Sequence, residues 1–124
     1  MTWYEHDRTR YEAEKIAVRK YYPRVRIFMK RKQLILLLKV QGRKRSYMIQ
    51  VVYPNDFPFD RPKAYCVKPN IRNAPHLYKD GRLSIHGDYE SSRTSGKNVL
   101  DWAKKWLEAY ENWLDTGKWS ERIK

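Results

Sequence analysis

The residues best suited to chemistry lie in one short segment, HLYKDGRLSIHG, at residues 76–87. Ser84 is its single small hydroxyl side chain, with His76 and His86 on either side and Asp88 just beyond. These are the groups of a serine–histidine–aspartate triad, but no glycine stands two residues before or after the serine, as the sharp turn of many hydrolases requires. The histidines and the aspartate also lack a recognised metal-ligand spacing. We therefore favour neither a hydrolase nor a metal site, and we expect no cofactor.

The one cysteine is the other candidate nucleophile. Cys66 lies between Tyr65 and Val67 in a strand-like run, which is typical of a buried structural thiol. A single cysteine also precludes an internal disulfide and is typical of a reducing compartment. No run of residues resembles a signal peptide or approaches the length of a membrane span. We therefore expect a cytoplasmic protein that makes no membrane contact.

The elements that position these residues are predicted by periodicity and by stop signals. Thr2 and Glu5 have the spacing of a capping box, and Pro23 stops a helix, so we expect one helix over residues 3–22. Four strand patterns follow, and the links between the first three are short enough for hairpins. These strands are placed at residues 24–30, 33–41, 44–53 and 63–67. The sequence thus predicts an α+β fold with an antiparallel meander sheet.

A long irregular region and a final helix complete the single domain that we expect over residues 1–124. Residues 68–97 are punctuated by Pro, Gly, Asn and Ser, and irregular regions of this length are usually functional or disordered. After them, Asn98 can cap a helix that ends at Gly117. Apolar residues recur there at helical spacing and predict a core-facing stripe. The stripe consists of Val99, Trp102, Ala103, Trp106, Tyr110, Trp113 and Leu114.

The net charge of +13, from 27 Lys and Arg against 14 Asp and Glu, points to an acidic partner. Nucleic acid and an acidic protein surface both fit this charge. The chain has five Trp and ten Tyr, but most of the Trp lie at helical spacing near the C-terminus, which indicates packing rather than base stacking. We therefore favour a protein partner and keep nucleic acid as an alternative. One basic cluster fits either partner: Arg43, Lys44 and Arg45.

Two segments, taken in order, carry a more specific signal. YPNDFPFDRPK at residues 53–63 closes a strand with three prolines, and APHLYKDGRLS at residues 74–84 leads through a glycine to Ser84. Together they resemble the signature of the ubiquitin-conjugating enzymes. In that signature an aromatic–proline run precedes an aliphatic–aromatic pair, a glycine, an aliphatic residue and the active-site cysteine. The resemblance covers essentially the whole chain. The ending WLEAYENWLDTGKW is more similar to bacterial members, some of which belong to operons of cyclic-oligonucleotide-based antiphage signalling (CBASS).

The resemblance implies a protein that carries an acyl group as a thioester and passes it to an amine. It puts Ser84 at the position of the active-site cysteine and His76 at that of the asparagine that stabilises the oxyanion. The implied flanking residues are Asp80, Gly81, Leu83, His86 and Asp88. The implied partners are an activating enzyme and either a ubiquitin-like protein or, in the antiphage operons, the C-terminus of a cGAS-like nucleotidyltransferase. The residues expected to contact partners are Arg19, Lys20, Lys30, Arg31, Lys32, Phe57, Pro58 and Phe59.

Serine at position 84 departs from the family, because thioester chemistry needs a thiolate and a serine hydroxyl is far less acidic. In the interpretation that we favour, Ser84 is an engineered replacement of a native cysteine that converts a labile thioester into a more durable oxyester. Two alternatives stay open: a natural variant that binds a ubiquitin-like partner without carrying it, and a basic nucleic-acid-binding protein. The histidine at position 76 can still donate a hydrogen bond to an oxyanion.

Overall fold

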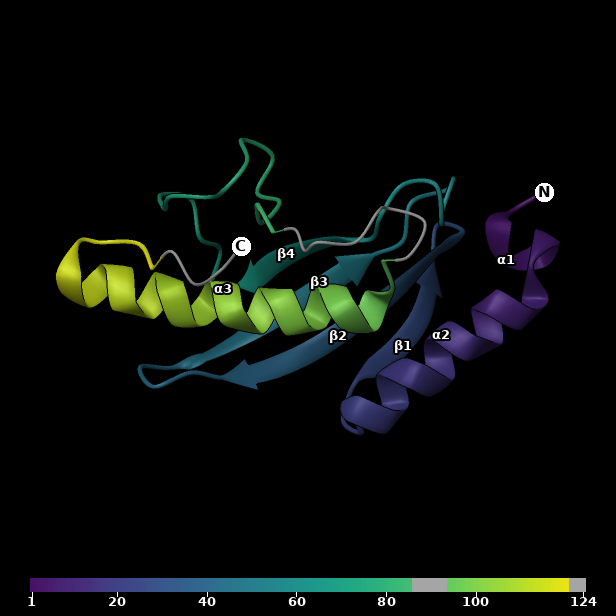
Figure 1. Ribbon diagram of the computed structural model, residues 1–124, viewed down its shortest axis with the longest axis horizontal. Helices are drawn as coiled ribbons and strands as arrows, with labels where there is room; N and C mark the ends of the chain where they lie inside the picture. The colour runs from purple at the N-terminus through teal and green to yellow at the C-terminus, as the bar shows by residue number, and fades with distance from the viewer. Residues whose placement is uncertain (86–93, 121–124) are drawn as a thin grey trace.

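The computed structural model describes residues 1–85 and 94–120 of the chain. It has the expected α+β layout, with two N-terminal helices, a four-stranded antiparallel sheet in the order β1-β2-β3-β4, and a long C-terminal helix. α3 lies across one face of the sheet, and α1 and α2 lie on the β1 side (Figure 1). No helix in the described ranges combines the length and the apolarity that crossing a bilayer requires. The elements are α1 (Trp3–His6), α2 (Arg8–Tyr21), β1 (Arg26–Lys30), β2 (Gln33–Gln41), β3 (Ser46–Val52), β4 (Lys63–Lys68) and α3 (Gly96–Thr116).

The N-terminal helix expected as one piece is two helices that meet at Asp7. The capping box at its start is confirmed, because the Glu5 amide donates to the Thr2 hydroxyl and the Glu5 carboxylate accepts from the Thr2 amide at 3.0 Å. Asp7 has a non-helical φ of −127°, and its carboxylate accepts from the Arg10 amide at 3.0 Å. The prediction of an unbroken helix was wrong because an aspartate within a helical pattern can cap a new helix instead of continuing the old one.

The sheet matches the expected meander to within two residues at every strand end. Two hairpins join β1 to β2 and β2 to β3, as the short links predict. β1 pairs with only the first part of β2, from Lys30 opposite Gln33 to Arg26 opposite Leu37. The edge of β2 over residues 38–41 is therefore left without a neighbouring strand on the β1 side.

The core lies between α3 and the sheet, and α3 differs in detail from its predicted form. Its N-cap is Ser95 rather than Asn98, and Asn98 instead donates its amide to the Ser95 hydroxyl at 3.2 Å as the capping-box partner. Gly117 ends the helix at a left-handed φ of 74°, as expected. Leu114, which the stripe placed in the core, is 50% exposed, whereas Leu107 two turns earlier on the same face is buried, so the last turn of α3 lies outside the core. The core residues of α3 are Val99, Leu100, Ala103, Trp106 and Leu107.

Glu14 is a buried acid that fixes the start of α3. Its carboxylate accepts from the Tyr53 hydroxyl at 2.5 Å, from the Gly96 amide at 2.9 Å and from Arg10 Nε at 3.1 Å. Burial, together with the nearby Glu14 charge, raises the pKa of Tyr53 well above its usual value, so the phenol stays protonated and donates. The first turn of α3 is thereby joined to α2 and to the end of β3.

Glu111 is a second buried acid and fixes the other end of α3. Its carboxylate accepts from the Arg43 amide at 2.9 Å, the Lys44 amide at 3.0 Å and the Tyr47 hydroxyl at 3.0 Å. Burial alone would raise the pKa of Glu111, but these hydrogen bonds outweigh burial and lower it. A Cβ atom at Gly42 would lie 2.5 Å from Glu111 Oε2, so the β2–β3 turn needs glycine at this point.

Candidate active site

Position 84 lies on a short ledge, residues 82–85, which runs beside β4. The Leu83 amide donates to the Ala64 carbonyl at 2.9 Å, and Leu83 also forms a β-bridge with Leu77 on its other side. Leu83 is 2% exposed, whereas the next residue, Ser84, is half-buried. The Leu83 side chain anchors the ledge in the core, and position 84 stays open to approach.

His76 meets Ser84 through the main chain. The His76 carbonyl accepts from the Ser84 amide at 2.9 Å and from Trp106 Nε1 at 2.8 Å. Its φ of 56° lies in the left-handed region, where asparagine and histidine are enriched among non-glycine residues. The exposed imidazole packs against Trp119, with ring centroids 5.2 Å apart. His76 thus lies next to position 84, and its ring is held on the side of Trp119.

Asp80 and Gly81 form the turn that leads into the ledge. Gly81 has a φ of 92°, which favours glycine, and its amide donates to the Tyr78 carbonyl at 2.9 Å. The Asp80 carboxylate accepts from the Arg82 amide at 3.0 Å. The turn is closed by the Tyr78 amide, which donates to the Arg82 carbonyl at 2.9 Å. Asp80 and Gly81 therefore fix the backbone conformation of the turn that leads to position 84.

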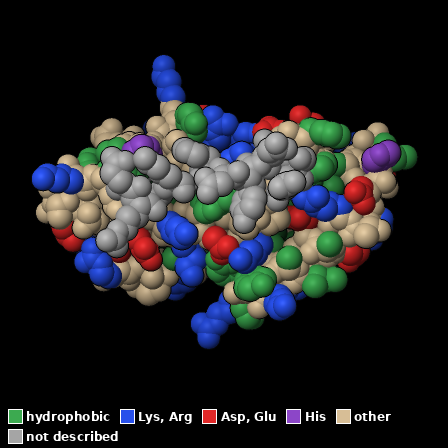
Figure 2. All heavy atoms as spheres, in the orientation of Figure 1, with side chains coloured by type: hydrophobic (Ala, Val, Ile, Leu, Met, Phe, Trp, Pro, Cys, Tyr) green, Lys and Arg blue, Asp and Glu red, His purple; other side chains and the backbone are tan. Residues whose placement is uncertain are grey.

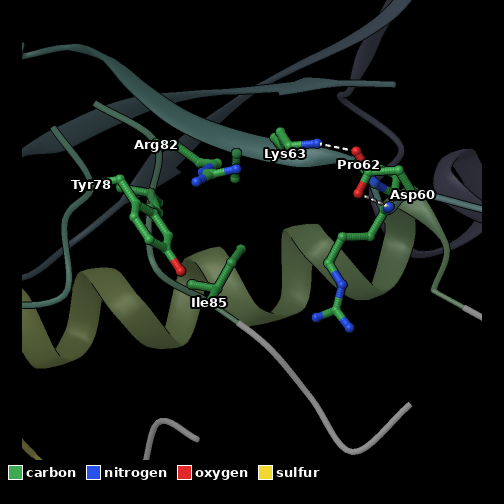
Figure 3. Close-up of a pocket in the computed structure, with 9 residues that line it drawn as sticks. Asp60, Pro62, Lys63, Tyr78, Arg82 and Ile85 are labelled. Carbon is green, nitrogen blue, oxygen red and sulfur yellow. Dashed lines mark hydrogen bonds and ion pairs between the residues drawn. The ribbon is translucent and has the colours of Figure 1, made fainter. Parts of the chain in front are cut away.

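A hollow of about 370 Å³ opens beside the ledge (Figure 3). The side chains of Tyr78, Arg82 and Ile85 face it from the ledge side, and Lys63 and Asp60 face it from the start of β4 and the loop before it. The whole lining is Asp60, Arg61, Pro62, Lys63, Ala64, Tyr78, Arg82, Leu83 and Ile85. Because Leu83 and Ile85 both contribute, the hollow adjoins position 84.

The hollow carries an excess of positive charge. Lys63 Nζ lies 2.6 Å from Asp60 Oδ2, and this hydrogen bond lowers the pKa of Asp60 despite partial burial. The Arg82 guanidinium lies over the Tyr78 ring at 4.1 Å. Its Nε is buried and has no hydrogen-bond partner in the described part of the chain. The Arg82 side chain still lines the hollow as a cation, which suits a ligand that brings a carboxylate or carbonyl oxygen.

The candidate nucleophiles differ in their surroundings. The Ser84 hydroxyl makes no hydrogen bond to another residue within ranges 1–85 and 94–120, and His86 and Asp88 lie outside the described residues. Cys66 is 7% exposed, and its thiol donates to the Pro69 carbonyl at 3.2 Å. Burial raises the pKa of the Cys66 thiol to about 11, so it stays protonated at neutral pH and has the structural role expected of it. In the described ranges no three His, Cys, Asp or Glu side chains gather into a possible metal site.

The aromatic residues expected to meet partners are divided between core and surface. Phe57 is 2% exposed and packs edge-on against Trp3 with ring centroids 4.6 Å apart, so it cannot contact a partner. The following peptide bond, to the half-buried Pro58, is cis. Phe59 is 82% exposed. Of the three, Phe59 is the residue that a partner can reach fully.

The basic residues expected to contact partners lie at opposite ends of β1 (Figure 1). Arg19 and Lys20 are exposed in the last turn of α2, next to the start of β1. The hairpin at residues 30–32 lies at the far end of β1, where the Lys32 carbonyl accepts from the Tyr4 hydroxyl of α1 at 3.2 Å. These residues therefore form two separate basic surfaces, because β1 runs antiparallel to the direction of α2 (Figure 1).

Three residues at the site are not predicted from the sequence as functional. Arg82 and Tyr78 line the hollow, and Trp106 holds the His76 carbonyl from α3. Arg82 could have been found from the sequence, because it is a cation two residues before position 84. Nothing in the sequence indicates that Trp106 reaches across 30 residues to His76.

The fold and the ledge are those of a domain of the ubiquitin-conjugating type, with a helical start, a four-stranded meander, a glycine turn, a ledge that carries residue 84 and a long helix. A sequence profile of the family described as Type II CBASS E2 protein matches residues 14–123. The chain belongs to this family, which places it in CBASS antiphage defence. A search of curated proteins gave no match.

Proposed function

We propose that position 84 receives the C-terminal carboxyl group of a partner protein from an activating enzyme. The observation that carries this proposal is the construction of the ledge. Leu83 is tied to Ala64 of β4 and Ser84 is tied to His76, while the side chain at position 84 stays half-exposed beside a hollow rich in positive charge. A rigid main chain that presents one small side chain is what acyl transfer requires of its acceptor position.

The chemistry depends on the atom at position 84. With cysteine there, a thiolate attacks the thioester on the activating enzyme, a new C–S bond forms, and the thiol of that enzyme leaves. An amine then attacks the new thioester, giving an amide and the free thiol. With Ser84 the hydroxyl attacks instead, an oxyester forms, and the departing thiolate takes up the hydroxyl proton. Because amines attack oxyesters more slowly than thioesters, the Ser84 form retains its acyl group. The role proposed for His76 is to donate a hydrogen bond to the oxyanion in each step.

The acyl group proposed is the C-terminus of a cGAS-like nucleotidyltransferase of the same defence operon, and a ubiquitin-like protein is the other candidate cargo. Family membership supports a partner from the operon. The hollow supports an extended tail, because the cationic Arg82 side chain and the exposed Tyr78 ring both line it. Phe59, exposed on the loop before β4, is a proposed contact for the body of a partner protein.

A second candidate function is a binding module that holds the same C-terminus without a covalent bond. The observation that favours it is the Ser84 hydroxyl, which has no hydrogen-bonded base among the described residues. An unactivated serine is a weak nucleophile. In this alternative the ledge and the hollow are retained for recognition alone.

An experiment that compares three forms of the chain distinguishes the two functions. The forms are the Ser84 chain, Ser84→Cys and Ser84→Ala. Each is mixed with the activating enzyme of the operon, its nucleotidyltransferase and ATP. The acyl-carrier function gives an adduct of Ser84→Cys that a thiol reductant removes, an adduct of the Ser84 form that only hydroxylamine or alkali removes, and none of Ser84→Ala. The binding-module function gives equal non-covalent binding by all three forms and no adduct. Absence of both adduct and binding contradicts both functions.

A further inference from the structure

A groove lies at the open edge of β2 and shares no residue with the hollow beside Ser84. Because β1 pairs with only the first part of β2, the rest of this strand borders a hollow of about 350 Å³ between the end of α2 and the middle of α3. Its walls carry three cations, Arg24, Lys39 and Lys104, and two aromatic residues, Tyr21 and Tyr22.

A second hollow, of about 260 Å³, adjoins this groove because Lys39 lines both. Lys39 on β2, Met48 on β3 and Lys68 on β4 are register partners in one row across the sheet. Strands are about 4.8 Å apart, so the two lysines straddle Met48 across about 10 Å. Arg45 and Ser46 complete the polar part of the lining. We call the two hollows together the basic track.

Among the described residues, the walls of the basic track contain no Asp or Glu. On the face seen in Figure 2, by contrast, acidic side chains lie among the basic ones, as on an ordinary solvated surface. Within the described ranges, Lys39, Arg45 and Lys68 form no ion pair. Cations that gather without acids or ion pairs repel one another, and a bound polyanion relieves that repulsion.

The acids packed nearest to the track are occupied by other groups. Asp101 of α3 accepts from the Tyr22 hydroxyl and lies 2.7 Å from Lys97. At the hairpin before Arg45, Asp115 pairs with both Arg43 and Lys44, the latter at 2.5 Å. Of the cluster Arg43–Arg45 singled out by the sequence, only Arg45 thus faces the track.

Tyr21 adds an exposed ring at the α2 end of the track. It is 56% exposed, and Lys97 Nζ and Lys20 Nζ lie 4.2 Å and 5.7 Å from its ring centroid. An exposed aromatic ring can stack on a base, and Lys20 beside it offers a counter-charge for a phosphate, whereas Lys97 is already paired with Asp101.

We propose that the basic track binds single-stranded nucleic acid. Phosphates lie against Lys39, Arg45 and Lys68, and a base stacks on Tyr21. An acidic protein segment would satisfy the cations but would leave the exposed ring without a stacking partner, so nucleic acid is the occupant that uses every feature of the track. This activity is independent of acyl transfer at position 84.

The test is fluorescence anisotropy of the full chain with fluorescein-labelled oligothymidine and oligouridine, at about 50 mM and about 200 mM salt. The track variant carries two substitutions, Lys39→Glu and Lys68→Glu, in the lining of the basic track. The control variant carries Lys79→Glu and Lys118→Glu, which change the net charge by the same amount at exposed positions outside the track. We expect the track variant to weaken binding by about tenfold or more, and to lower the salt slope by about two phosphate contacts. The control variant weakens binding by less than about threefold, through net charge alone.

Tyr21→Ala tests the stacking without any change of charge. It is expected to weaken binding by about tenfold with an unchanged salt slope, whereas Tyr21→Phe keeps the affinity. Thermal unfolding of each variant shows that it is folded. The proposal is overturned if no binding occurs at low salt, if the two charge variants weaken binding equally, or if Tyr21→Ala binds like the parent. Equal competition by polyglutamate of matched length also overturns it, in favour of an acidic protein partner.

Discussion

The amide of Ser84 donates to the carbonyl of His76 at 2.9 Å, so residue 84 is held in place by its main chain and not by its side chain. Trp106 Nε1 holds the same carbonyl from α3. A change between serine and cysteine at position 84 therefore leaves the ledge in place. For this reason the side chain at position 84 can be varied to test the chemistry separately from the fold.

The Trp106 hydrogen bond is expected to stabilise the ledge locally. Trp106→Phe removes the Nε1 donor and leaves space in a fully buried site, so we expect the free energy of unfolding to fall by about 2–4 kcal/mol. Hydrogen exchange at the Ser84 amide is expected to accelerate more than at the Ile49 amide in the core. Trp113→Phe, a half-buried position on the same helix, is the matched control. Equal acceleration at the two amides would contradict a local role for Trp106.

Gly42 and Glu111 are expected to be energetically coupled. Gly42→Ala puts a Cβ about 2.5 Å from Glu111 Oε2, and overpacking of this kind costs about 1–3 kcal/mol of unfolding free energy. In a Glu111→Ala background the carboxylate is gone, so the same substitution is expected to cost less than half as much. Urea unfolding of the four forms in a double-mutant cycle measures the difference. Strict additivity would show that the carboxylate does not restrict Gly42.

Glu111 is also expected to contribute to acid sensitivity. Its pKa is lowered in the folded chain from the ordinary value of 4.5, despite burial, by the Lys44 and Arg43 amides and the Tyr47 hydroxyl. As the pH falls below the ordinary value, the unfolded chain takes up this proton before the folded chain does. The stabilisation is therefore complete above that pH and is lost as the pH falls through the folded pKa. Urea unfolding at neutral pH and at about pH 3 is expected to show a smaller difference in stability for Glu111→Gln than for the parent. An unchanged difference would contradict this.

Arg82 is expected to act on the partner's tail and not on the fold. Arg82→Ala removes a cationic side chain that lines the hollow, and the loss of one charge-assisted hydrogen bond to the tail corresponds to about a tenfold slower adduct formation by Ser84→Cys. The measurement is the initial rate of adduct formation at limiting partner concentration. Lys79→Ala, an exposed cation on the turn before Arg82, is expected to leave the rate within about twofold. Equal rates for both variants would exclude the hollow from recognition.

The sequence predicts the order of the elements and the turn at Gly81 because these depend on local patterns. Hairpin links, the helical stripe, and the glycine before Leu83 each have a local physical cause. The break at Asp7 also has a local cause, but an aspartate in a helical pattern is compatible with either outcome. For α3, Ser95 and Asn98 are both possible caps, and the approach of Gly96 to Glu14 favours the earlier one.

The features that the sequence does not predict are contacts between distant segments. Glu14 and Glu111 stand at core-facing helical positions, which signals a buried role. Apart from Arg10, which is four residues from Glu14, their donors come from residues 39 to 82 positions away. The division of the basic residues between the two ends of β1 depends on the strand direction relative to α2. The burial of Phe57 beside Trp3 likewise depends on the tertiary fold.

The most direct test of the central claim is a peptide-mass measurement that locates the acyl group. The Ser84→Cys form, with the activating enzyme, ATP and the nucleotidyltransferase of the operon, is digested under mildly acidic conditions to preserve the thioester. We predict a peptide containing residue 84 that carries the partner's C-terminal residues, lost on reduction, and formed equally in a Cys66→Ser background because Cys66 is buried. An adduct that maps to Cys66, or no adduct in either background, would contradict the assignment of position 84 as the acyl-carrying residue.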